Sequence, residues 1–219
     1  MTGEMQLKGR AAIITGAASG IGRALAHALA RRGCHLALAD VNMAGLEETA
    51  QRAATGVRIT RHSLDVGDAQ AIAAFPDLVR AEHGRVDLLV NNAGVALGGT
   101  FEQINEADFD WLLAINFFGA VRMTRALLPM LKASDDALIV NISSIFGIIA
   151  PPGQTAYCAS KFAVRGFSES LRHELKDTSV GVTVVHPGGV ATSIARNASS
   201  QYIRPPSLRA RHRHRTPSS

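Results

Sequence analysis

Short apolar runs alternate with longer stretches of helical periodicity from the start of the chain to about residue 200. The runs have the length of strands and lie at residues 11–15, 35–40, 57–62, 86–91, 137–142 and 182–185. Several are apolar at nearly every position, which is typical of strands covered on both faces. The stretches between them are long enough for crossover helices. The pattern therefore predicts an α/β protein with a doubly wound parallel sheet and helices on both of its faces.

Two helical stretches carry polar residues of chemical interest. In the stretch 106–131 the apolar residues form one stripe, and Asn116 lies inside it. In the stretch 157–175, Tyr157 and Lys161 share a face with apolar residues further along the helix. Any chemistry carried by these side chains would be held on rigid elements.

Pro76 interrupts the helical stretch at 68–82. Proline lacks the N–H that bonds the carbonyl four residues earlier, and its ring crowds the preceding turn. We therefore expect this helix to be kinked or to begin late.

The composition is that of a globular protein with its own core. The 219 residues are 47% hydrophobic and 19% charged, and their number fits one domain. No apolar run approaches the ~20 residues of a membrane helix, and no apolar leader precedes the first strand. The two cysteines, Cys34 and Cys158, stand far apart, which fits a reducing compartment. We expect a cytoplasmic protein without a membrane partner.

The formal net charge of +5 belongs to the end of the chain. Residues 201–219 hold five arginines and no acid, and the first 200 residues balance 18 basic against 18 acidic residues. We therefore expect no nucleic-acid partner, since binding by this segment would be weak and sequence-blind. We divide the chain into a domain at 1–198 and a Pro-, Arg- and Ser-rich tail at 199–219, expected to be disordered. The Arg–His repeats of the tail have no metal-site geometry, and we expect no bound metal.

A glycine-rich segment, TGAASGIG at 15–22, follows the first strand and opens a helix. Gly16, Gly20 and Gly22 permit a tight turn, close approach of a pyrophosphate and close packing of the helix. The helix N-terminus then offers unpaired N–H groups to the anion. Because the spacing is not that of the common G-x-G-x-x-G fingerprint, a glycine-rich turn without a ligand remains the alternative.

Asp40 ends the second strand, 18 residues after Gly22. A carboxylate at this place can accept both hydroxyls of an adenosine ribose and would repel a 2′-phosphate. Ser19 and Val41 offer no cation that could hold such a phosphate. NAD is therefore favoured over NADP as the cofactor, and the alternative for Asp40 is a helix N-cap.

Tyr157 and Lys161 place a phenol and an ammonium one helical turn apart. A tyrosine that exchanges protons near neutrality must lower its pKa from about 10 by roughly 3 units, or ~4 kcal/mol. A cation about 4 Å away, at an effective dielectric constant of about 20, supplies that much. The alternative is an ordinary surface pair, because this spacing is common.

Taken together, the motifs resemble those of the short-chain dehydrogenase/reductase family over about residues 7–196. They occur in the family's order and spacing and comprise TGAASGIG at 15–22, Asp40, Asp65-Val66, NNAG at 91–94, Asn116, NISS at 141–144, YCASK at 157–161 and PGGVAT at 187–192. The resemblance implies a Rossmann-like fold. It also implies an NAD-dependent oxidoreductase that interconverts a secondary alcohol and a ketone, with this small molecule as its partner.

The resemblance implies four catalytic residues. Tyr157 exchanges a proton with the substrate oxygen, and Ser144 hydrogen-bonds that oxygen. Ser143 is the less favoured donor, because alternate strand residues face opposite sides. Lys161 lowers the pKa of Tyr157 and binds the nicotinamide ribose. Asn116 holds a water that links Lys161 to solvent, and its alternative is a buried asparagine with satisfied hydrogen bonds.

The resemblance further implies a set of residues that contact the cofactor. In chain order they are Gly16, Ser19, Gly20, Ile21, Gly22, Asp40, Asp65, Val66, Asn92, Gly94, Tyr157, Lys161, Pro187, Val190 and Thr192. Asp65 and Val66 would contact the adenine, and Val190 and Thr192 the nicotinamide carboxamide. The segment at 91–94 has an alternative, structural role, in which it locks the central strands.

Family members continue past the last of these motifs with a substrate-covering loop, helices and a final strand. We expect these to be missing, because the sequence after Asn197 contains no apolar strand. The strand at 182–185 would then be an exposed edge, and a poorly covered substrate site would weaken the activity. A homodimer through the helices at 106–131 and 157–175 could survive. The alternative function is a protein that binds the nicotinamide nucleotide without turnover and acts through partners.

Overall fold

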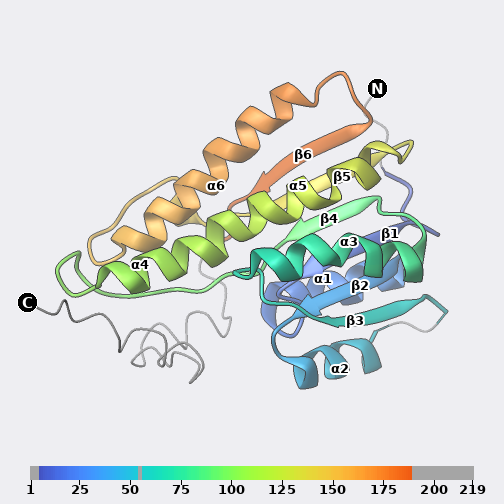
Figure 1. Ribbon diagram of the computed structural model, residues 1–219, viewed down its shortest axis with the longest axis horizontal. Coiled ribbons are helices and arrows are strands. Elements are labelled where there is room, and N and C mark those ends of the chain that lie inside the picture. The colour runs from blue at the N-terminus through green and yellow to red at the C-terminus, as the bar shows by residue number, and fades with distance from the viewer. Residues whose placement is uncertain (1–4, 54–55, 189–219) are drawn as a thin grey trace, which may run out of the picture.

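The computed structural model of the protein describes residues 5–53 and 56–188. In these residues six strands form one parallel sheet in the order β3-β2-β1-β4-β5-β6 (Figure 1). They are β1 (Ala11–Thr15), β2 (His35–Asp40), β3 (Ile59–Ser63), β4 (Leu88–Asn91), β5 (Ala137–Ile142) and β6 (Val180–Val185). The strand order reverses between β1 and β4. Open α/β sheets bind their ligands at such a switch point, outside the carboxyl ends of the strands.

Helices cover both faces of the sheet. On one face lie α1 (Gly20–Arg31) and α2 (Met43–Gln51). On the other lie α3 (Ala69–His83), the continuous run of α4 (Glu106–Leu113), the π-helical turn η1 (Ala114–Phe118) and α5 (Gly119–Lys132), and finally α6 (Thr155–Glu174). A short 3₁₀ turn, η2 (Ile145–Gly147), follows β5. This arrangement confirms the predicted doubly wound, Rossmann-like α/β fold.

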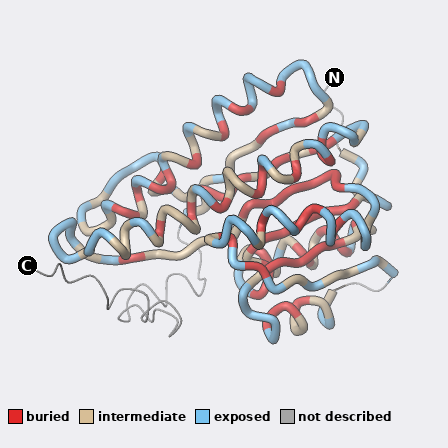
Figure 2. The backbone as a smooth tube through the Cα atoms, in the orientation of Figure 1, coloured by how far each residue is buried: buried red, intermediate tan, exposed pale blue. Residues whose placement is uncertain are grey.

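The inner strands feed two separate cores. Successive residues point to opposite faces, so Ile13 enters the core under α3, α5 and α6, while Ile14 enters the core under α1 and α2. Figure 2 shows these strands as the buried centre of the molecule, with exposed residues on the outer sides of the helices. The near-continuous apolar runs of the sequence arise from this burial on both faces.

The strand bounds differ from the predicted ones by at most two residues. β3 begins at Ile59 rather than 57, β4 at Leu88 rather than 86, and β6 at Val180 rather than 182. Just before β4, the Asp87 carboxylate accepts the N–H of Ala11 at 2.8 Å, and the backbone N–H of Asp87 donates to the Ala11 carbonyl at 2.9 Å.

Of the two alternatives for the helix around Pro76, the late start is wrong, and the kink stays a prediction. α3 begins at Ala69, where the Asp68 side chain caps it by accepting the N–H groups of Gln70 and Ala71. It then runs without interruption through Pro76 to His83. Pro76 is buried on the same face as Ile72, Phe75 and Val79, so its ring adds to the core and offsets the lost intrahelical hydrogen bond.

The run Glu106–Lys132 is 27 residues long, and by length and composition alone it could cross a membrane. We expected no apolar run long enough for a membrane helix. This run does not read as continuous in the sequence, because Arg122 and Arg125 interrupt it. A single such helix is weak evidence for a membrane span, because the core helices of other proteins have the same length and composition. Met123, Leu127 and Leu131 are fully buried in the core against the sheet, and a third of the apolar window is buried in all.

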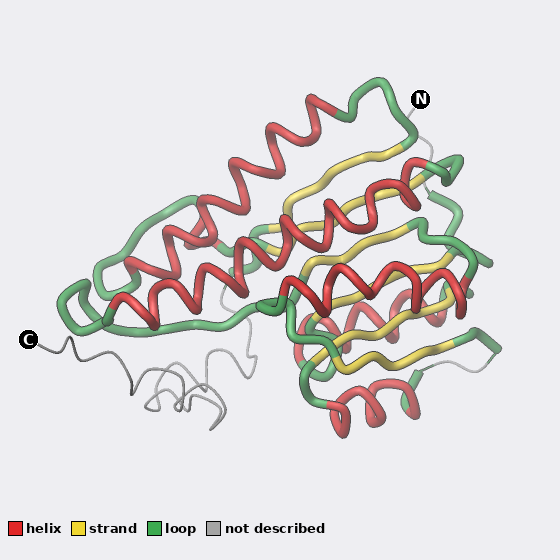
Figure 3. The backbone as a smooth tube through the Cα atoms, in the orientation of Figure 1, coloured by secondary structure: helices red, strands yellow, loops and turns green. Residues whose placement is uncertain are grey.

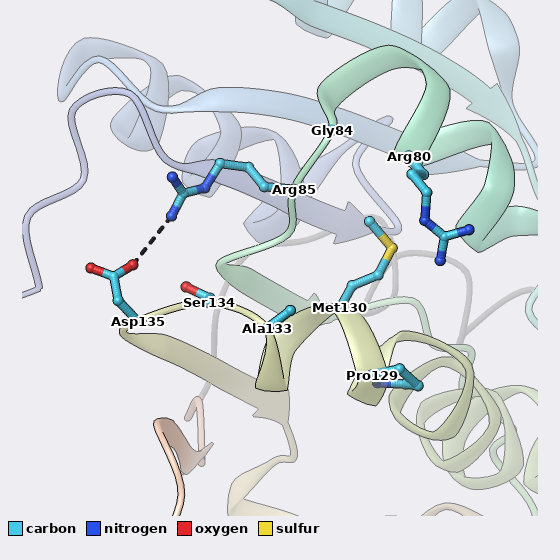
Figure 4. Close-up of a pocket in the computed structure, with 8 residues that line it drawn as sticks. All are labelled: Arg80, Gly84, Arg85, Pro129, Met130, Ala133, Ser134 and Asp135. Carbon is cyan, nitrogen blue, oxygen red and sulfur yellow. Dashed lines mark hydrogen bonds and ion pairs between the residues drawn. The ribbon is translucent and has the colours of Figure 1, made fainter.

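A cluster of charged residues fixes the amino-terminal ends of β1 and β4, away from the candidate site. The fully buried Asp87 carboxylate contacts Arg10 at 3.2 Å and Arg85 at 2.6 Å, and accepts from the Ser134 hydroxyl at 2.7 Å. Arg85 also reaches Asp135 across a surface hollow of about 480 Å³ between the ends of α3 and α5 (Figure 4). Because the arginines of this hollow are paired with carboxylates, we interpret the cluster as structural.

β6 is an edge strand of the sheet within the described residues. The expectations of a disordered tail, a missing last strand, a missing lid and a domain boundary at 198 all fall outside the described part of the chain. They stay predictions.

Candidate active site

Figure 3 shows the strands of the sheet in yellow, with helices in red and the loops that connect them in green. The glycine segment forms the tight loop between β1 and α1, at the carboxyl end of the sheet. Gly16 and Gly20 adopt positive φ angles of +66° and +53°, which side chains disfavour. A Cβ on Gly22 would lie 2.2 Å from the Gly16 carbonyl oxygen, so only glycine lets α1 approach the loop this closely. Ser19 is the N-cap position, and the first N–H groups of α1, at Gly20 and Ile21, point out of the helix end.

Asp40 lies at the end of β2, directly beside this loop. Its two carboxylate oxygens accept the backbone N–H of Ala18 at 3.1 Å and that of Asn42 at 2.9 Å. The carboxylate is half-buried and each oxygen keeps a lone pair for another donor. The N-cap of α2 is Asn42, not Asp40, which removes the capping alternative for the aspartate.

The segment after β4 is tied to the end of β1. Asn92 donates its side-chain amide to the carbonyls of Thr15 and Gly16, at 3.0 and 3.1 Å. The Thr15 hydroxyl in turn accepts the N–H groups of Asn92 and Ala93, at 3.0 and 3.1 Å. These bonds give Asn92 the structural function that the sequence left open, because they fix the shape of the glycine loop.

Asp65 and Val66 follow β3 and differ in exposure. Asp65 is exposed and accepts the N–H of Gly67 at 2.8 Å. Val66 is buried and packs against Gly119, where a Cβ would approach its side chain to 3.0 Å. The close contact holds the end of β3 against the start of α5.

Ser144 and Tyr157 meet at the carboxyl end of β5. Ser144 caps η2 by accepting the N–H of Phe146 at 3.1 Å. Burial raises the pKa of the Tyr157 phenol above its ordinary 10.0, and a hydrogen bond from Ser144 offsets part of this rise. The Phe146 ring packs edge-on to Tyr157, with 6.2 Å between ring centres. Within the protein, the phenol therefore stays protonated at neutral pH.

Lys161 is buried one turn after Tyr157. Its ammonium donates to the Ile142 carbonyl at 3.0 Å and lies 5.6 Å from the centre of the Tyr157 ring. Burial lowers the pKa of Lys161 to about 8. The expected lowering of the tyrosine pKa by Lys161 is thus not found within the protein, because burial acts against the charged form of both side chains.

Ser143 bonds to the backbone of α6. Its hydroxyl donates to the Lys161 carbonyl at 2.9 Å, and its side chain is buried against Gly147. The two serines therefore face opposite sides of the strand end, as strand alternation requires.

Asn116 lies in the π-helical turn η1, buried between two segments of the site. Its amide pairs with the backbone of Val95, accepting the N–H at 2.8 Å and donating to the carbonyl at 2.9 Å, and donates to the Ser160 hydroxyl at 3.1 Å. Gly94 lies beside it, and a Cβ there would come within 3.2 Å of the Asn116 oxygen and 3.6 Å of the Lys161 nitrogen. The side chain is satisfied by these bonds, and its participation in proton exchange stays a prediction.

Pro187 follows β6, and its carbonyl accepts the N–H of Ile145 at 2.9 Å. The neighbouring His186 ring nitrogen lies 3.0 Å from the Ser144 carbonyl. This segment therefore borders the Ser144 side of the site. Val190 and Thr192 lie outside the described residues.

A buried chain of polar side chains, not predicted from the sequence, lies beneath the site. Asn91 donates to Asn141 at 2.8 Å and to Thr124 at 3.1 Å, and Asn141 donates to Ser168 at 2.8 Å. The chain runs from α5 across β4 and β5 to α6. A single asparagine at the end of each apolar strand, in LLVN and ALIVNI, was the signal that could have indicated it.

Comparison with known proteins identifies the group to which this Rossmann-like chain belongs. The family model for short chain dehydrogenases matches residues 10–203. The Mycobacterium tuberculosis protein SadH is 48% identical over 195 residues, which cover 88% of this chain and 71% of SadH.

Two solved structures support the same assignment. A short chain dehydrogenase/reductase from Burkholderia phymatum in complex with NAD has a TM-score of 0.88 at 34% identity, covering 95% of this chain and 74% of its own. A metagenomic short-chain oxidoreductase in complex with NADP has a TM-score of 0.80 at 37% identity, covering 85% of each chain. The chain belongs to the short-chain dehydrogenase/reductase family, a family of oxidoreductases.

Proposed function

We propose that the protein is an NAD-dependent oxidoreductase that interconverts a secondary alcohol and a ketone. The observation that carries this proposal is the meeting of Ser144, Tyr157 and Lys161 at the carboxyl end of the sheet, beside the glycine loop. The family assignment supports it, as do the NAD and NADP complexes of two structural relatives. Open α/β sheets bind their ligands at such a switch point of the strands.

The residues of the site fit a nicotinamide nucleotide. The N–H groups that begin α1 suit a pyrophosphate, and the side chain missing at Gly94 leaves the approach to Lys161 open. When bound, the nucleotide supplies or accepts the hydride. We assign its contacts to Gly16, Ser19, Gly20, Ile21, Gly22, Asp40, Asp65, Val66, Asn92, Gly94, Tyr157, Lys161, Pro187, Val190 and Thr192.

Asp40 supports NAD over NADP. Its carboxylate is held in place by two backbone N–H groups and has free lone pairs for the ribose hydroxyls. A 2′-phosphate at the same place would meet a fixed negative charge, which costs binding energy.

The protein's own residues would handle the proton. In the direction of ketone reduction, the Tyr157 hydroxyl donates its proton to the substrate oxygen, and Ser144 donates a hydrogen bond to that oxygen. The raised pKa of Tyr157 keeps this proton in place at neutral pH. In the direction of alcohol oxidation the phenolate must form, and a protonated Lys161 favours it. We place Asn116 next to this pair as the link through which Lys161 exchanges protons with solvent.

The experiment is an assay of NADH consumption at 340 nm over a panel of ketones, with Tyr157→Phe as the matched variant. We expect the variant to reduce ketones roughly 10²–10⁴-fold more slowly than the wild type. It should bind NADH as the wild type does. Equal rates in both proteins would remove the assigned acid. NADH binding without turnover on any carbonyl would instead favour the alternative, a nucleotide-binding protein that acts through partners.

We further propose a homodimer that pairs through the α4–η1–α5 run and α6. Phe118 and Phe162 lie on these elements, and they are 44% and 40% exposed. Large exposed aromatic rings on neighbouring helices are typical of interaction surfaces.

A further inference from the structure

We propose that Arg23 is a positioning residue that holds the glycine loop and Asp40 in the shape that binds the adenosine half of the cofactor. This inference rests on the proposed nicotinamide-nucleotide site. Arg23 lies on α1, and nothing in its sequence context marks it. Its guanidinium contacts two parts of the fold, the glycine loop and α2, which must stay together for the site to exist.

The first contact is with the loop itself. Arg23 Nη2 donates to the Ala18 carbonyl, and its Nε donates to the Thr49 hydroxyl at 3.0 Å. Thr49 is completely buried, and its hydroxyl lies 2.9 Å from the carbonyls of both Ala17 and Gly45. Arg23 thus holds the Ala18 carbonyl of the glycine loop, and Thr49 shares its one hydroxyl proton between the neighbouring Ala17 carbonyl and that of Gly45.

Thr49 and Asp40 contact opposite ends of one peptide group. Thr49 contacts the carbonyl of this peptide, and Asp40 accepts its N–H. This is the peptide between Ala17 and Ala18, whose N–H donates to Asp40 Oδ2 at 3.1 Å. A peptide plane with both ends bonded has one orientation. Thr49, and through it Arg23, thus supports one of the two N–H groups that direct the Asp40 carboxylate, the other being that of Asn42 at 2.9 Å.

The guanidinium is itself fixed from the other side, on α2. Glu48 contacts Arg23 at 2.8 Å, and the Gly45 carbonyl accepts from Arg23 at 3.3 Å. A Cβ on Gly45 would lie 2.8 Å from the Ala18 Cβ and 3.0 Å from the Ala18 oxygen, so α2 touches the loop at a position that tolerates no side chain. The arginine fork spans this contact, and a lysine cannot reproduce its paired donors.

The test measures the dissociation constant of NADH by fluorescence titration, together with the thermal midpoint and the KM and kcat for NADH. Arg23→Leu should raise the Kd and the KM about tenfold, the loss expected for one or two buried hydrogen bonds, with kcat at saturating NADH unchanged. Thr49→Val, which removes the hydroxyl and keeps the shape, should weaken binding in the same direction. Arg23→Lys should restore less than half of the loss in binding free energy.

Arg52→Leu is the matched control. Arg52 pairs with the same Glu48 at 2.9 Å but is 65% exposed and belongs to the outer side of α2. It should leave the NADH affinity unchanged. If Arg23→Leu lowers the thermal midpoint yet binds NADH like the wild type, the residue is merely structural and the inference fails. If the wild type binds no NADH, the proposed function fails instead.

Discussion

The ammonium of Lys161 is bonded to the Ile142 carbonyl at 3.0 Å and stands 5.6 Å from the centre of the Tyr157 ring. The lysine is therefore tied to the end of β5 and not to the phenol that it is expected to serve. Its burial lowers its pKa to about 8, so a part of the population is neutral just above physiological pH. Holding this amine inside the fold opposes stability as long as it is charged.

Replacing this lysine should stabilise the protein at neutral pH. The folded pKa of about 8 lies below the unfolded value of 10.5, so the cost of burying the charge is complete below pH 8 and vanishes above 10.5. We expect Lys161→Met to raise the free energy of unfolding at pH 7 by on the order of 3 kcal/mol, less the lost bond to Ile142, and to abolish turnover. Urea unfolding at pH 7 and pH 10 measures this, with the exposed Lys132→Met as control. A difference that does not shrink toward pH 10 would contradict the assignment.

Removing the Asp40 carboxylate should change the choice of cofactor. Asp40→Ala loses the acceptor for the ribose hydroxyls and the charge that repels a 2′-phosphate, so we expect the NADH affinity to fall about tenfold and the NADPH affinity to fall less or rise. Titration of both nucleotides measures the ratio. Asp110→Asn removes a charge from an exposed position of α4 and should leave the ratio as in the wild type. An unchanged ratio in Asp40→Ala would exclude Asp40 as the determinant of NAD preference.

Two glycine-to-alanine changes should have opposite effects. A methyl group on Gly22 would collide with the Gly16 carbonyl at 2.2 Å, so Gly22→Ala must shift the loop and should abolish NADH binding. Gly166 lies in α6 with nothing within 4 Å of an added Cβ, and Gly166→Ala should stabilise the protein by about 0.5–1 kcal/mol. Thermal unfolding and NADH titration separate the two. NADH binding by Gly22→Ala at wild-type affinity would mean that the loop does not contact the cofactor.

Replacing Asp87, in the ion cluster at the far end of the sheet, should lower the stability of the protein strongly and leave the candidate active site unchanged. Burial raises the pKa of Asp87, but its bonds to Arg85, Ala11, Ser134 and Arg10 outweigh this and hold the pKa below the ordinary 3.8. Its contribution is therefore present above pH 3.8 and is lost as the pH falls through the lower folded value. Asp87→Asn should destabilise by about 3–5 kcal/mol, because it leaves two arginines short of a buried partner.

Asp135→Asn is the matched control for this cluster. Asp135 pairs with the same two arginines, but its side chain is 75% exposed, and its loss should cost about 1 kcal/mol or less. Urea unfolding measures both variants, and both should bind NADH as the wild type does. Equal effects of the two substitutions would show that burial of Asp87 does not govern the cluster.

A single charged side chain, introduced on α6, tests the proposed dimer. Phe162→Glu on α6 should turn a dimer in light scattering into a monomer, because it buries an unpaired carboxylate in the interface. Leu78→Glu, at a 54% exposed position of α3, is the control and should leave the mass unchanged. A wild type that is monomeric at all concentrations would contradict the proposal.

The sequence predicted the sheet well, because its inner strands are buried on both faces and read as continuous apolar runs. It predicted the start of the helix around Pro76 wrongly, because the rule for proline weighs a hydrogen bond and omits the core that Pro76 enters. The order of the motifs located Asp40, Ser144 and Tyr157, which the fold brings to one edge. Their roles in catalysis and binding stay predictions.

Other features left no trace in the pattern. The contact between Arg23 and the Ala18 carbonyl depends on how α1 and α2 approach each other, which no periodicity encodes. The pKa of Lys161 is set by the depth at which the side chain is buried. Its helical spacing from Tyr157 indicates only which face of the helix the side chain lies on. The position of Val95 against Asn116 likewise depends on tertiary packing.

The π-helical turn at Ala114–Phe118 has a consequence for anyone who edits this protein. In this turn the Gly119 N–H bonds back to the Ala114 carbonyl, five residues earlier, so the chain holds one residue more than a regular α-helix would need. Deleting any one of these five residues would give an uninterrupted α-helix and remove this widened turn. The helix would then be regular, but Asn116 would lose its hydrogen bonds to the backbone of Val95. Idealising this helix would thus remove the irregular turn that holds Asn116 against the backbone of Val95.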